Sequence, residues 1–267
     1  MNNTNVRAKT LMTLPESART CGVDGSVVEL LPSAAYSAAY TPQSHVIGFA
    51  FETQLGVHGF ASDRHEDFYR QANSFAFIPS GCDVFSESAE GGEYLTLALA
   101  PKWLSEINCK KPINQLLSAS AIQMARALRK QLIANSVVDD SLVEQLASDI
   151  VQALTANKKS LNYVLGDRQL KRLDEFIVAN IDQSISVLDM ASVLNMSAGH
   201  FSRLFKVSVG VSPFDYLIQK RLDFSRNRLC HSLDSLSAIA FSSGFSSHAH
   251  MSMAFNKYLG VVPSAIR

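Results

Sequence analysis

The sequence predicts a two-domain α+β fold, with an N-terminal β-barrel or jelly roll followed by helices, and a C-terminal all-α domain that holds two helix-turn-helix units. Three observations support this prediction. Short β-branched and aromatic runs fill residues 26–100. After Pro101, apolar residues recur instead at steps of three and four, which is the period of a helix. Near the C-terminus, one short sequence pattern occurs twice.

The N-terminal runs have the pattern of short strands, because each is apolar or alternating and is bounded by turn-forming residues. The runs are SVVELL, HVIGFAFE, LGVHGF, SFAFIPS, DVFSES and EYLTLALA, and the turns include Pro32-Ser33, Pro79-Ser80-Gly81 and Gly91-Gly92. Several short strands at this spacing are typical of a small antiparallel barrel or jelly roll. We expect an apolar barrel interior lined by aromatic side chains, including Phe49, Phe51, Phe60, Phe75, Phe77 and Tyr94.

Two helices are expected after the strands. Within residues 117–135, one helical face carries Ile122, Ala125, Leu128 and Leu132. Asp139 and Asp140 then stand where carboxylates favour a helix N-terminus, and apolar residues continue the helical period to Leu154. These helices either pack against their own barrel or form the seam of a dimer, and the sequence leaves both interpretations open.

The composition is that of an ordinary globular protein, because 47% of the 267 residues are hydrophobic and 18% are charged. No stretch approaches the roughly 20 apolar residues that span a bilayer, and the first 20 residues lack the apolar segment of a secretory signal. The four cysteines are scattered, which favours reduced thiols over a disulfide framework. We therefore expect a cytoplasmic protein that does not enter a membrane.

A domain boundary is expected in the segment 155–169, which is polar and interrupted by Gly166. This boundary divides the chain into residues 1–158 and 159–267. The whole chain has 24 Lys and Arg against 24 Asp and Glu, but from Arg168 onward 11 basic residues stand against 7 acidic ones. A modestly basic C-terminal third is compatible with nucleic-acid binding.

The repeated pattern occupies residues 197–213, SAGHFSRLFKVSVGVSP, and residues 247–263, SHAHMSMAFNKYLGVVP. Ser, His, Ser, Phe, Gly, Val and Pro stand at the same offsets in both copies. Each copy follows a short amphipathic helix and a residue suited to positive φ, Asn195 in the first copy and Gly244 in the second. A serine then caps a second helix. Short helix, tight turn and second helix is the helix-turn-helix plan.

The two units are expected at about 187–210 and 235–260, joined by a linker helix over about 212–231. In each second helix, apolar residues at helical spacing face the core, namely Phe201, Leu204 and Phe205 in the first and Met251, Ala254 and Phe255 in the second. The opposite faces are left to contact a partner. The alternative is a duplicated helical hairpin with no role in DNA binding.

The last hundred or so residues resemble the DNA-binding domain of the AraC/XylS family of bacterial transcription regulators. The matching pieces are MSAGHFSRLFK, GVSPFDYL, KRLDFSRNRL and IAFSSGFSSHAHMSMAFNKYLGVVPSAIR. The last piece is similar to the family signature through Gly244-Phe245, Phe255 and Pro263. The resemblance implies seven helices with two helix-turn-helix units, which enter successive major-groove segments on one face of double-stranded DNA.

Helical spacing leaves an outward face in each second helix, made of Gly199, Ser202, Arg203 and Lys206 in the first unit and of His248, Ala249, Ser252, Met253 and Asn256 in the second. The resemblance implies that Gly199, Ser202 and Arg203, and their counterparts Ala249, Ser252 and Met253, hold the base-facing places. We add His200, Ser247 and Lys257 to the residues expected to contact DNA. Arg203 is the expected base reader, because a guanidinium can bond bidentately to guanine O6 and N7. A phosphate contact is the alternative for Arg203. Met253 stands where the family commonly has arginine, and it can only touch a thymine methyl group. We therefore expect the second unit to use phosphate contacts or DNA shape, through Ser247, Ser252 and Lys257.

No metal, cofactor or catalytic site is expected. The two histidines of 248–250 point to different faces of a helix, and we interpret His200 and its counterpart in the second copy as DNA-adjacent or capping residues. The run SFAFIPSGCDVFSES resembles the strand-turn-strand of cupin barrels, but Val84 stands at the place of a metal-binding histidine. His58 and His65 are too far apart for the HxH pair of catalytic cupins.

The sequence therefore predicts a sequence-specific DNA-binding transcription regulator, an activator that responds to a small-molecule effector and forms a homodimer. RNA polymerase is its expected protein partner, and the residues of an effector site are not assigned. The alternative is an effector-independent DNA-binding protein whose barrel serves only for dimerisation. A cupin enzyme fused to a DNA-binding domain is a third hypothesis, which the missing histidine disfavours.

Overall fold

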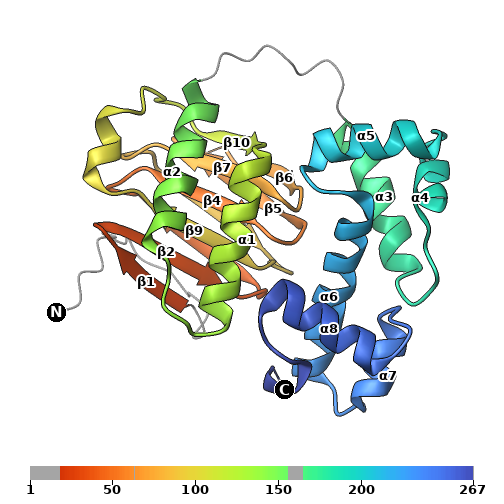
Figure 1. Cartoon of the computed structure of the whole chain (residues 1–267). Coiled ribbons are helices and arrows are strands. Elements are labelled where there is room, and N and C mark those ends of the chain that lie inside the picture. Colours follow the sequence, from red (N-terminus) through yellow and green to blue (C-terminus); the bar gives the residue numbers. More distant parts are fainter. Residues whose placement is uncertain (1–18, 63, 156–164, 267) are drawn as a thin grey trace. The chain divides into compact units, whose positions relative to one another are not determined.

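The structure is a computed structural model that describes residues 19–62, 64–155 and 165–266. The chain divides into two compact units (Figure 1). Within the described residues, the N-terminal unit holds all the strands, α1 up to Leu132 and α2, and the C-terminal unit holds α3 to α8. Two predictions fall outside these residues. Most of the segment expected to lack a secretory signal lies in 1–18, and the boundary at 158/159 lies in 156–164.

The elements of the N-terminal unit are β1 (Arg19–Val23), β2 (Ser26–Leu31), β3 (Tyr36–Tyr40), β4 (Val46–Ala50), β5 (Gln54–Phe60), β6 (Glu66–Arg70), β7 (Ser74–Ile78), β8 (Val84–Ser88), β9 (Tyr94–Ala98), the 3-10 helix η1 (Pro101–Ser105), β10 (Ile113–Leu116), α1 (Ala119–Ile133) and α2 (Asp140–Thr155). Among the described residues they form two antiparallel sheets. The six-stranded sheet has the order β1-β2-β9-β4-β7-β10, and the four-stranded sheet has the order β3-β8-β5-β6. The predicted N-terminal strands followed by helices are confirmed, and closure into a cupin barrel stays a prediction.

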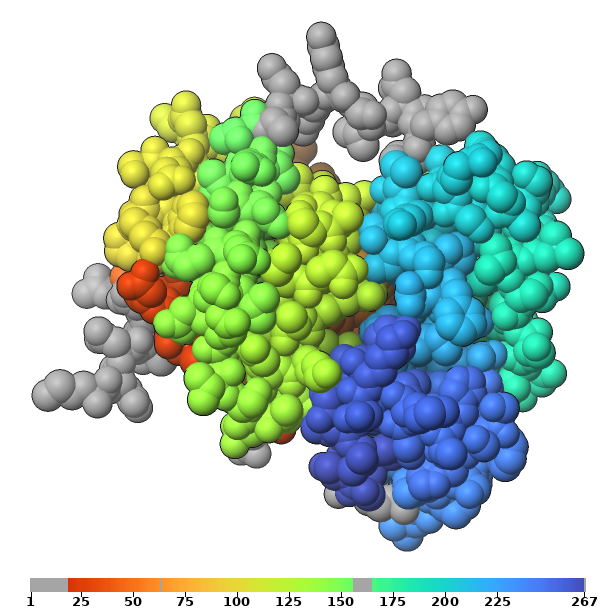
Figure 2. Space-filling model, in the orientation of Figure 1, coloured from red at the N-terminus to blue at the C-terminus, as the bar shows by residue number. Residues whose placement is uncertain are grey.

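One face of the six-stranded sheet forms a hydrophobic core beneath the two helices. Phe49 of β4 and Phe75 of β7 lie opposite each other in register, and both are fully buried. Phe51 packs edge-on against Phe49, with ring centroids 4.8 Å apart, and the guanidinium of Arg129 in α1 lies 4.6 Å from the Phe51 centroid. In the space-filling view, the green atoms of α1 and α2 hide most of the sheet from this side (Figure 2).

This arrangement corrects the prediction that these aromatic side chains line the interior of a barrel. Phe49, Phe51, Phe75 and Phe77 lie on the helix-covered face of the sheet, not between the two sheets. Successive side chains of a strand point to opposite faces, so the face between the sheets carries other residues, such as Tyr94. Phe49, Phe51, Phe75 and Phe77 were correctly predicted to be core, but the helices supply the apolar surface that buries them. Phe60 and Tyr94 are only partly buried.

The helices α1 and α2 pack against their own chain. The four apolar residues expected on one face of α1 (Ile122, Ala125, Leu128 and Leu132) are all buried, as are Leu146 and Ile150 of α2. A buried ion pair adds to this packing, because Arg129 of α1 pairs with Glu93 just before β9 and both side chains are 2% exposed. The first interpretation of these helices is therefore correct for these residues.

The elements of the C-terminal unit are α3 (Asp167–Ala179), α4 (Val187–Val193), α5 (Ala198–Val209), α6 (Pro213–His231), α7 (Leu236–Ser242), α8 (His248–Leu259) and the 3-10 helix η2 (Pro263–Ala265). The long helix α6 is at the centre. Its buried Leu222 and Leu229 belong to one hydrophobic cluster with residues of α7 and α8. Tyr216, nearer the start of α6, packs edge-on against Phe205 of α5, with ring centroids 5.2 Å apart. Figure 1 shows α4 and α5 near one end of α6, and α7 and α8 near the other.

Arg221 of α6 joins the two halves of this unit. Its buried side chain donates a hydrogen bond of 2.6 Å to the backbone oxygen of Gln183, which lies between α3 and α4. A Cβ atom added to Gly244, in the turn between α7 and α8, would lie 2.6 Å from Arg221 Nε and 2.2 Å from the backbone oxygen of Ile181. The connection that precedes α4, the middle of α6 and the turn before α8 therefore meet at one point, which we call the Arg221 junction.

Candidate nucleic-acid interface

The two helix pairs α4–α5 and α7–α8 make the same turn. Asn195 has φ of 55° and Gly244 has φ of 78°, as the sequence predicted for both positions. One backbone hydrogen bond closes each turn. Met196 N donates to the oxygen of Ala191 at 3.0 Å, and Phe245 N donates to the oxygen of Ala240 at 2.9 Å.

The ends of the second helices are also equivalent. Ser197 Oγ accepts a hydrogen bond from the backbone N–H of His200 at the start of α5, and Ser247 Oγ accepts one from His250 at the start of α8. Both helices end at a glycine in the left-handed conformation, Gly210 with φ of 77° and Gly260 with φ of 75°. The predicted serine caps and glycine ends are confirmed. The second pair has one more residue between turn and cap, Ser246.

Equivalent residues of α5 and α8 face the protein core. Phe201 and Phe205 of α5 are fully buried, and so are Met251 and Phe255 of α8. Ala254 is 7% exposed, whereas Leu204 is only partly buried. The predicted inward faces are therefore confirmed, except that Leu204 lies at the edge of its face.

The outward face of α5 carries the residues predicted for the first unit. Gly199, Arg203 and Lys206 are exposed, and His200 and Ser202 are partly exposed. A Cβ atom at Gly199 would meet nothing within 4 Å, so the backbone there is open to a close approach. The Ser202 hydroxyl donates 2.8 Å to the oxygen of Ala198, which leaves its lone pairs as acceptors. Arg203 and Lys206 are thus the cations of this face.

The outward face of α8 is less charged. His248, Ala249, Met253, Asn256 and Lys257 are exposed, with Met253 at 66%, and Ser247 and Ser252 are partly exposed. Two polar groups of this face bind each other, since Ser252 Oγ and His248 Nε2 lie 3.2 Å apart. The ammonium of Lys257 lies 4.8 Å from the ring centroid of Tyr258, whose hydroxyl donates to Asp215 of α6. Lys257 is the only Lys or Arg of the described helix α8.

His250, in the first turn of α8, makes its contacts within the helix pair α7–α8. His250 Nδ1 lies 3.0 Å from Ser246 Oγ, and the ring packs edge-on against Phe245 with centroids 5.3 Å apart. These contacts favour a structural role for His250. Among the described residues, no three His, Cys, Asp or Glu side chains are grouped so as to hold a metal ion.

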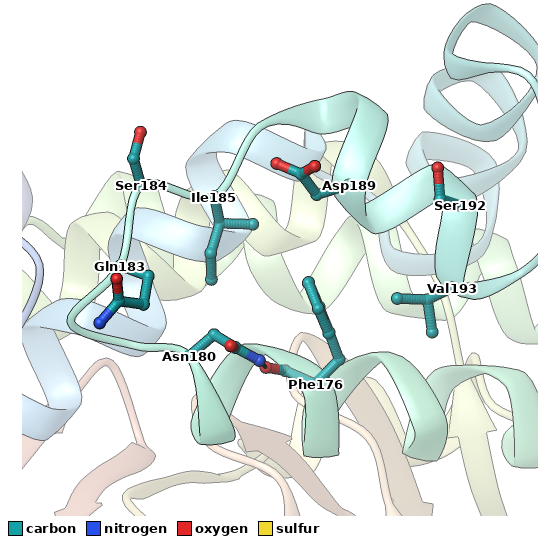
Figure 3. Close-up of a pocket in the computed structure, with 8 residues that line it drawn as sticks. All are labelled: Phe176, Asn180, Gln183, Ser184, Ile185, Asp189, Ser192 and Val193. Carbon is teal, nitrogen blue, oxygen red and sulfur yellow. Dashed lines mark hydrogen bonds between the residues drawn. The ribbon is translucent and has the colours of Figure 1, made fainter.

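A shallow pocket of about 410 Å³ lies between α3, the connection after it, and α4 (Figure 3). Phe176 of α3 and Val193 of α4 give it an apolar floor, and Asp189 is its acidic group. Asp189 accepts hydrogen bonds from the backbone and side chain of Ser186, which lower its pKa and engage it in capping α4. Its carboxylate is therefore already engaged.

Sequence reasoning missed the Arg221 junction. The run KRLDFSRNRL contains Arg221, but an arginine in a helix is usually exposed. The only sequence signal was the glycine at position 244, which has no side chain where the arginine and a backbone oxygen come close.

The comparison with known proteins identifies the C-terminal region. Residues 190–267 match a protein-family model described as a helix-turn-helix domain. The C-terminal domain is an AraC-type helix-turn-helix domain. The AraC-type domain covers both helix pairs except the first turn of α4.

Two curated relatives and one solved structure illustrate the similarity. The probable transcriptional regulator LumQ of Photobacterium leiognathi is 31% identical over 153 residues, which cover 55% of this chain and 60% of LumQ. The raffinose operon transcriptional regulatory protein RafR of Pediococcus pentosaceus is 24% identical over 254 residues, which cover 89% of each protein. A transcriptional regulator with an AraC-type domain from Chromobacterium violaceum is 29% identical, with a TM-score of 0.36, over 38% of this chain and 89% of that chain. This chain thus spans three fifths of LumQ.

Both curated relatives are named as transcriptional regulators, LumQ as a probable one. No helix among the described residues is long and apolar enough to cross a membrane. All four cysteines are free, as expected. The DNA contacts of individual residues in α5 and α8 stay predictions.

Proposed function

We propose that this protein is a sequence-specific regulator of transcription that binds double-stranded DNA through two helix-turn-helix units, at about 187–210 and 235–260. The repeated geometry of the AraC-type domain carries the proposal. Two helix pairs with the same turn, cap and buried face expose α5 and α8 from opposite ends of α6. A recognition helix that presents one solvated face beyond a fixed turn fits the major groove.

The exposed residues of α5 and α8 suggest different roles for the two units. Arg203 reads a guanine, because its guanidinium is exposed at the centre of the outward face of α5. Gly199 allows close approach, and Ser202 accepts hydrogen bonds. The second unit positions the protein on the phosphate backbone through Ser247, Ser252 and Lys257, since Met253 and Ala249 offer no comparable hydrogen bonds.

The N-terminal unit serves as sensor and dimerisation unit in this proposal. A small-molecule effector binds there, the protein acts as a homodimeric activator in the cytoplasm, and RNA polymerase is its partner at the promoter. The resemblance to the AraC/XylS family supports these finer assignments. The alternative is a scaffold that dimerises without an effector.

A binding titration with two chain lengths tests the seat of DNA binding. Operator duplexes are first selected from a randomised library with the full chain. A fragment of residues 159–267 should bind the selected duplex, more weakly than the full chain because it lacks the avidity of a dimer. Circular dichroism verifies that the fragment is helical. If residues 1–158 bound this duplex and the helical fragment did not, the assignment would be wrong.

Elemental analysis of the purified full chain tests the hypothesis of a cupin enzyme. We expect no stoichiometric zinc, iron or manganese, because the buried Val84 stands at the expected place of a histidine ligand. One tightly held metal ion per chain would revive the enzyme.

A further inference from the structure

The face between the two sheets of the N-terminal unit is chemically unlike the core beneath the helices. Along β9, Leu95 and Leu97 are fully buried, whereas Tyr94 and Thr96 on the other face are partly exposed. Tyr94 hydrogen-bonds Arg70 of β6, which belongs to the other sheet. Tyr94 and Arg70 therefore face each other between the sheets, at a place that solvent reaches.

A group of polar and aromatic side chains gathers around Arg70. We call it the Arg70 cluster, and its members are Arg70, Tyr94, Tyr36, Tyr40, His58 and Phe68, all of which are partly exposed. The guanidinium of Arg70 lies 5.4 Å from the ring centroid of Tyr94 and 5.7 Å from that of Phe68. Gly48 of β4 makes room for Tyr94, because a Cβ atom there would lie 1.9 Å from the tyrosine oxygen.

Within the part of the chain that the structure describes, no ion pair neutralises the charge of Arg70. Among the described residues, no carboxylate lies within ion-pair distance of its guanidinium. The carboxylate of Glu29, on β2, binds Thr96 instead, from which it accepts a hydrogen bond of 3.3 Å. A partly buried guanidinium bound only to a neutral hydroxyl retains donors for an anion, and Arg binds carboxylates bidentately.

The neighbours of Arg70 add donors and planar surfaces but no negative charge. Burial raises the pKa values of Tyr40 and Tyr94, so both hydroxyls stay protonated at neutral pH. Burial, and then the charge of Arg70, lower the pKa of His58, which favours the neutral imidazole. His58 stacks on Phe68 with centroids 5.0 Å apart, and its buried Nδ1 has no hydrogen-bond partner.

We propose that the Arg70 cluster binds a small organic carboxylate with a planar body. The carboxylate pairs with the guanidinium of Arg70 and accepts from the tyrosine hydroxyls, and the planar body stacks among the rings of Tyr36, Tyr94 and Phe68. This inference rests on the proposed sensing role of the N-terminal unit, because it names the chemical class of the effector. The charge of the ligand, more than its apolar area, decides its affinity.

Isothermal titration of the full chain without DNA tests this site. The probes are benzoate, salicylate and trans-cinnamate, each compared with its neutral amide. At least one carboxylate should bind, and its amide should bind at least about tenfold more weakly, because the amide loses the charge-assisted bonds. Arg70→Gln should weaken the bound carboxylate at least about tenfold. Arg64→Gln, which changes an exposed arginine of the same unit, should leave its affinity unchanged.

Three outcomes would overturn the proposal: no carboxylate of the panel binds, the amide binds as well as its acid, or folded Arg70→Gln retains full affinity. Tyr94→Phe keeps the ring and removes one donor. It provides a second test if Arg70→Gln does not fold, and a bound carboxylate whose affinity it leaves unchanged contradicts the cluster. DNA affinity is measured separately with and without the ligand. A carboxylate that binds without changing DNA affinity leaves the site intact and contradicts the sensing role alone.

Discussion

The two helix pairs of the AraC-type domain share a scaffold and differ in what they expose. Turn, cap, glycine end and buried aromatic residues occupy equivalent places in α4–α5 and α7–α8. Fifty residues apart, however, Arg203 in α5 corresponds to Met253 in α8, and Lys206 corresponds to Asn256. Backbone geometry dictates the first set of residues, whereas the outward positions carry no such constraint. The repeat therefore preserves the fold of the two units and not the residues on their outward faces.

The two turns also differ in what surrounds them. Asn195 lies in an exposed turn, and asparagine tolerates the left-handed conformation. Gly244 lies against Arg221 and the backbone oxygen of Ile181. The second turn thus tolerates no side chain, although both turns have nearly the same conformation.

The largest expected effect comes from breaking the second turn. Gly244→Ala should lower the free energy of unfolding by about 2–5 kcal/mol, because the strain of positive φ adds to a close contact with backbone. Asn195→Ala should cost about 1 kcal/mol, from the strain alone. Thermal and urea unfolding followed by helical circular dichroism measure both. Gly199→Ala is the control, and it should be neutral or slightly stabilising in the open first turn of α5. Equal costs at 195 and 244 would contradict the close approach.

The next largest effect is expected on operator binding by the first unit, where Arg203 is the proposed base reader. Arg203→Ala should weaken operator binding by about 1–3 kcal/mol and relax base preference at one base pair, because a bidentate contact to guanine is lost. The measurement is a titration against operators randomised in the half that faces the first unit. Should the variant weaken all sequences alike, Arg203 would be a phosphate contact instead.

A smaller and different effect is expected from the cation of α8. Lys257→Ala should weaken binding to all sequences equally and reduce the slope of log affinity against log salt by about one, as for one lost phosphate contact. Titrations at several salt concentrations measure this slope. Tyr258→Phe is a matched control, since it keeps the ring beside Lys257 and removes the hydroxyl that donates to Asp215. A loss of base preference in Lys257→Ala would give the second unit a reading role.

The smallest effect is expected at the counterpart of Arg203. Met253→Ala should change operator affinity by less than about 0.5 kcal/mol, beyond the loss of a contact to a thymine methyl group. The same randomised operators serve for this variant. If Met253→Ala erased specificity while Arg203→Ala preserved it, the two units would have the reverse of the roles proposed here.

The sequence predicted those features that local backbone chemistry decides. Asn195, Gly244 and the serine caps were readable because their conformations favour few residue types. The place of the aromatic residues in the N-terminal unit was not readable, because strand alternation does not tell which face a helix will cover. The Arg70 cluster and the Arg221 junction join segments distant in the sequence, and apart from Gly244 no local pattern marks these contacts. The outward faces of α5 and α8 were predicted from helical spacing, and their exposure agrees with that prediction.

The Arg221 junction has a consequence for the DNA itself. The junction holds the connection before α4 and the turn before α8 against the middle of α6. The distance between α5 and α8 is therefore restrained. The 19 residues of α6 span about 28 Å, close to the roughly 34 Å of one turn of B-DNA. Insertion of about five base pairs between the contacted segments would turn them to opposite sides of the duplex, whereas about ten would restore the side and double the distance. Under the proposed function, the spacing between the contacted base pairs is therefore part of the recognised sequence.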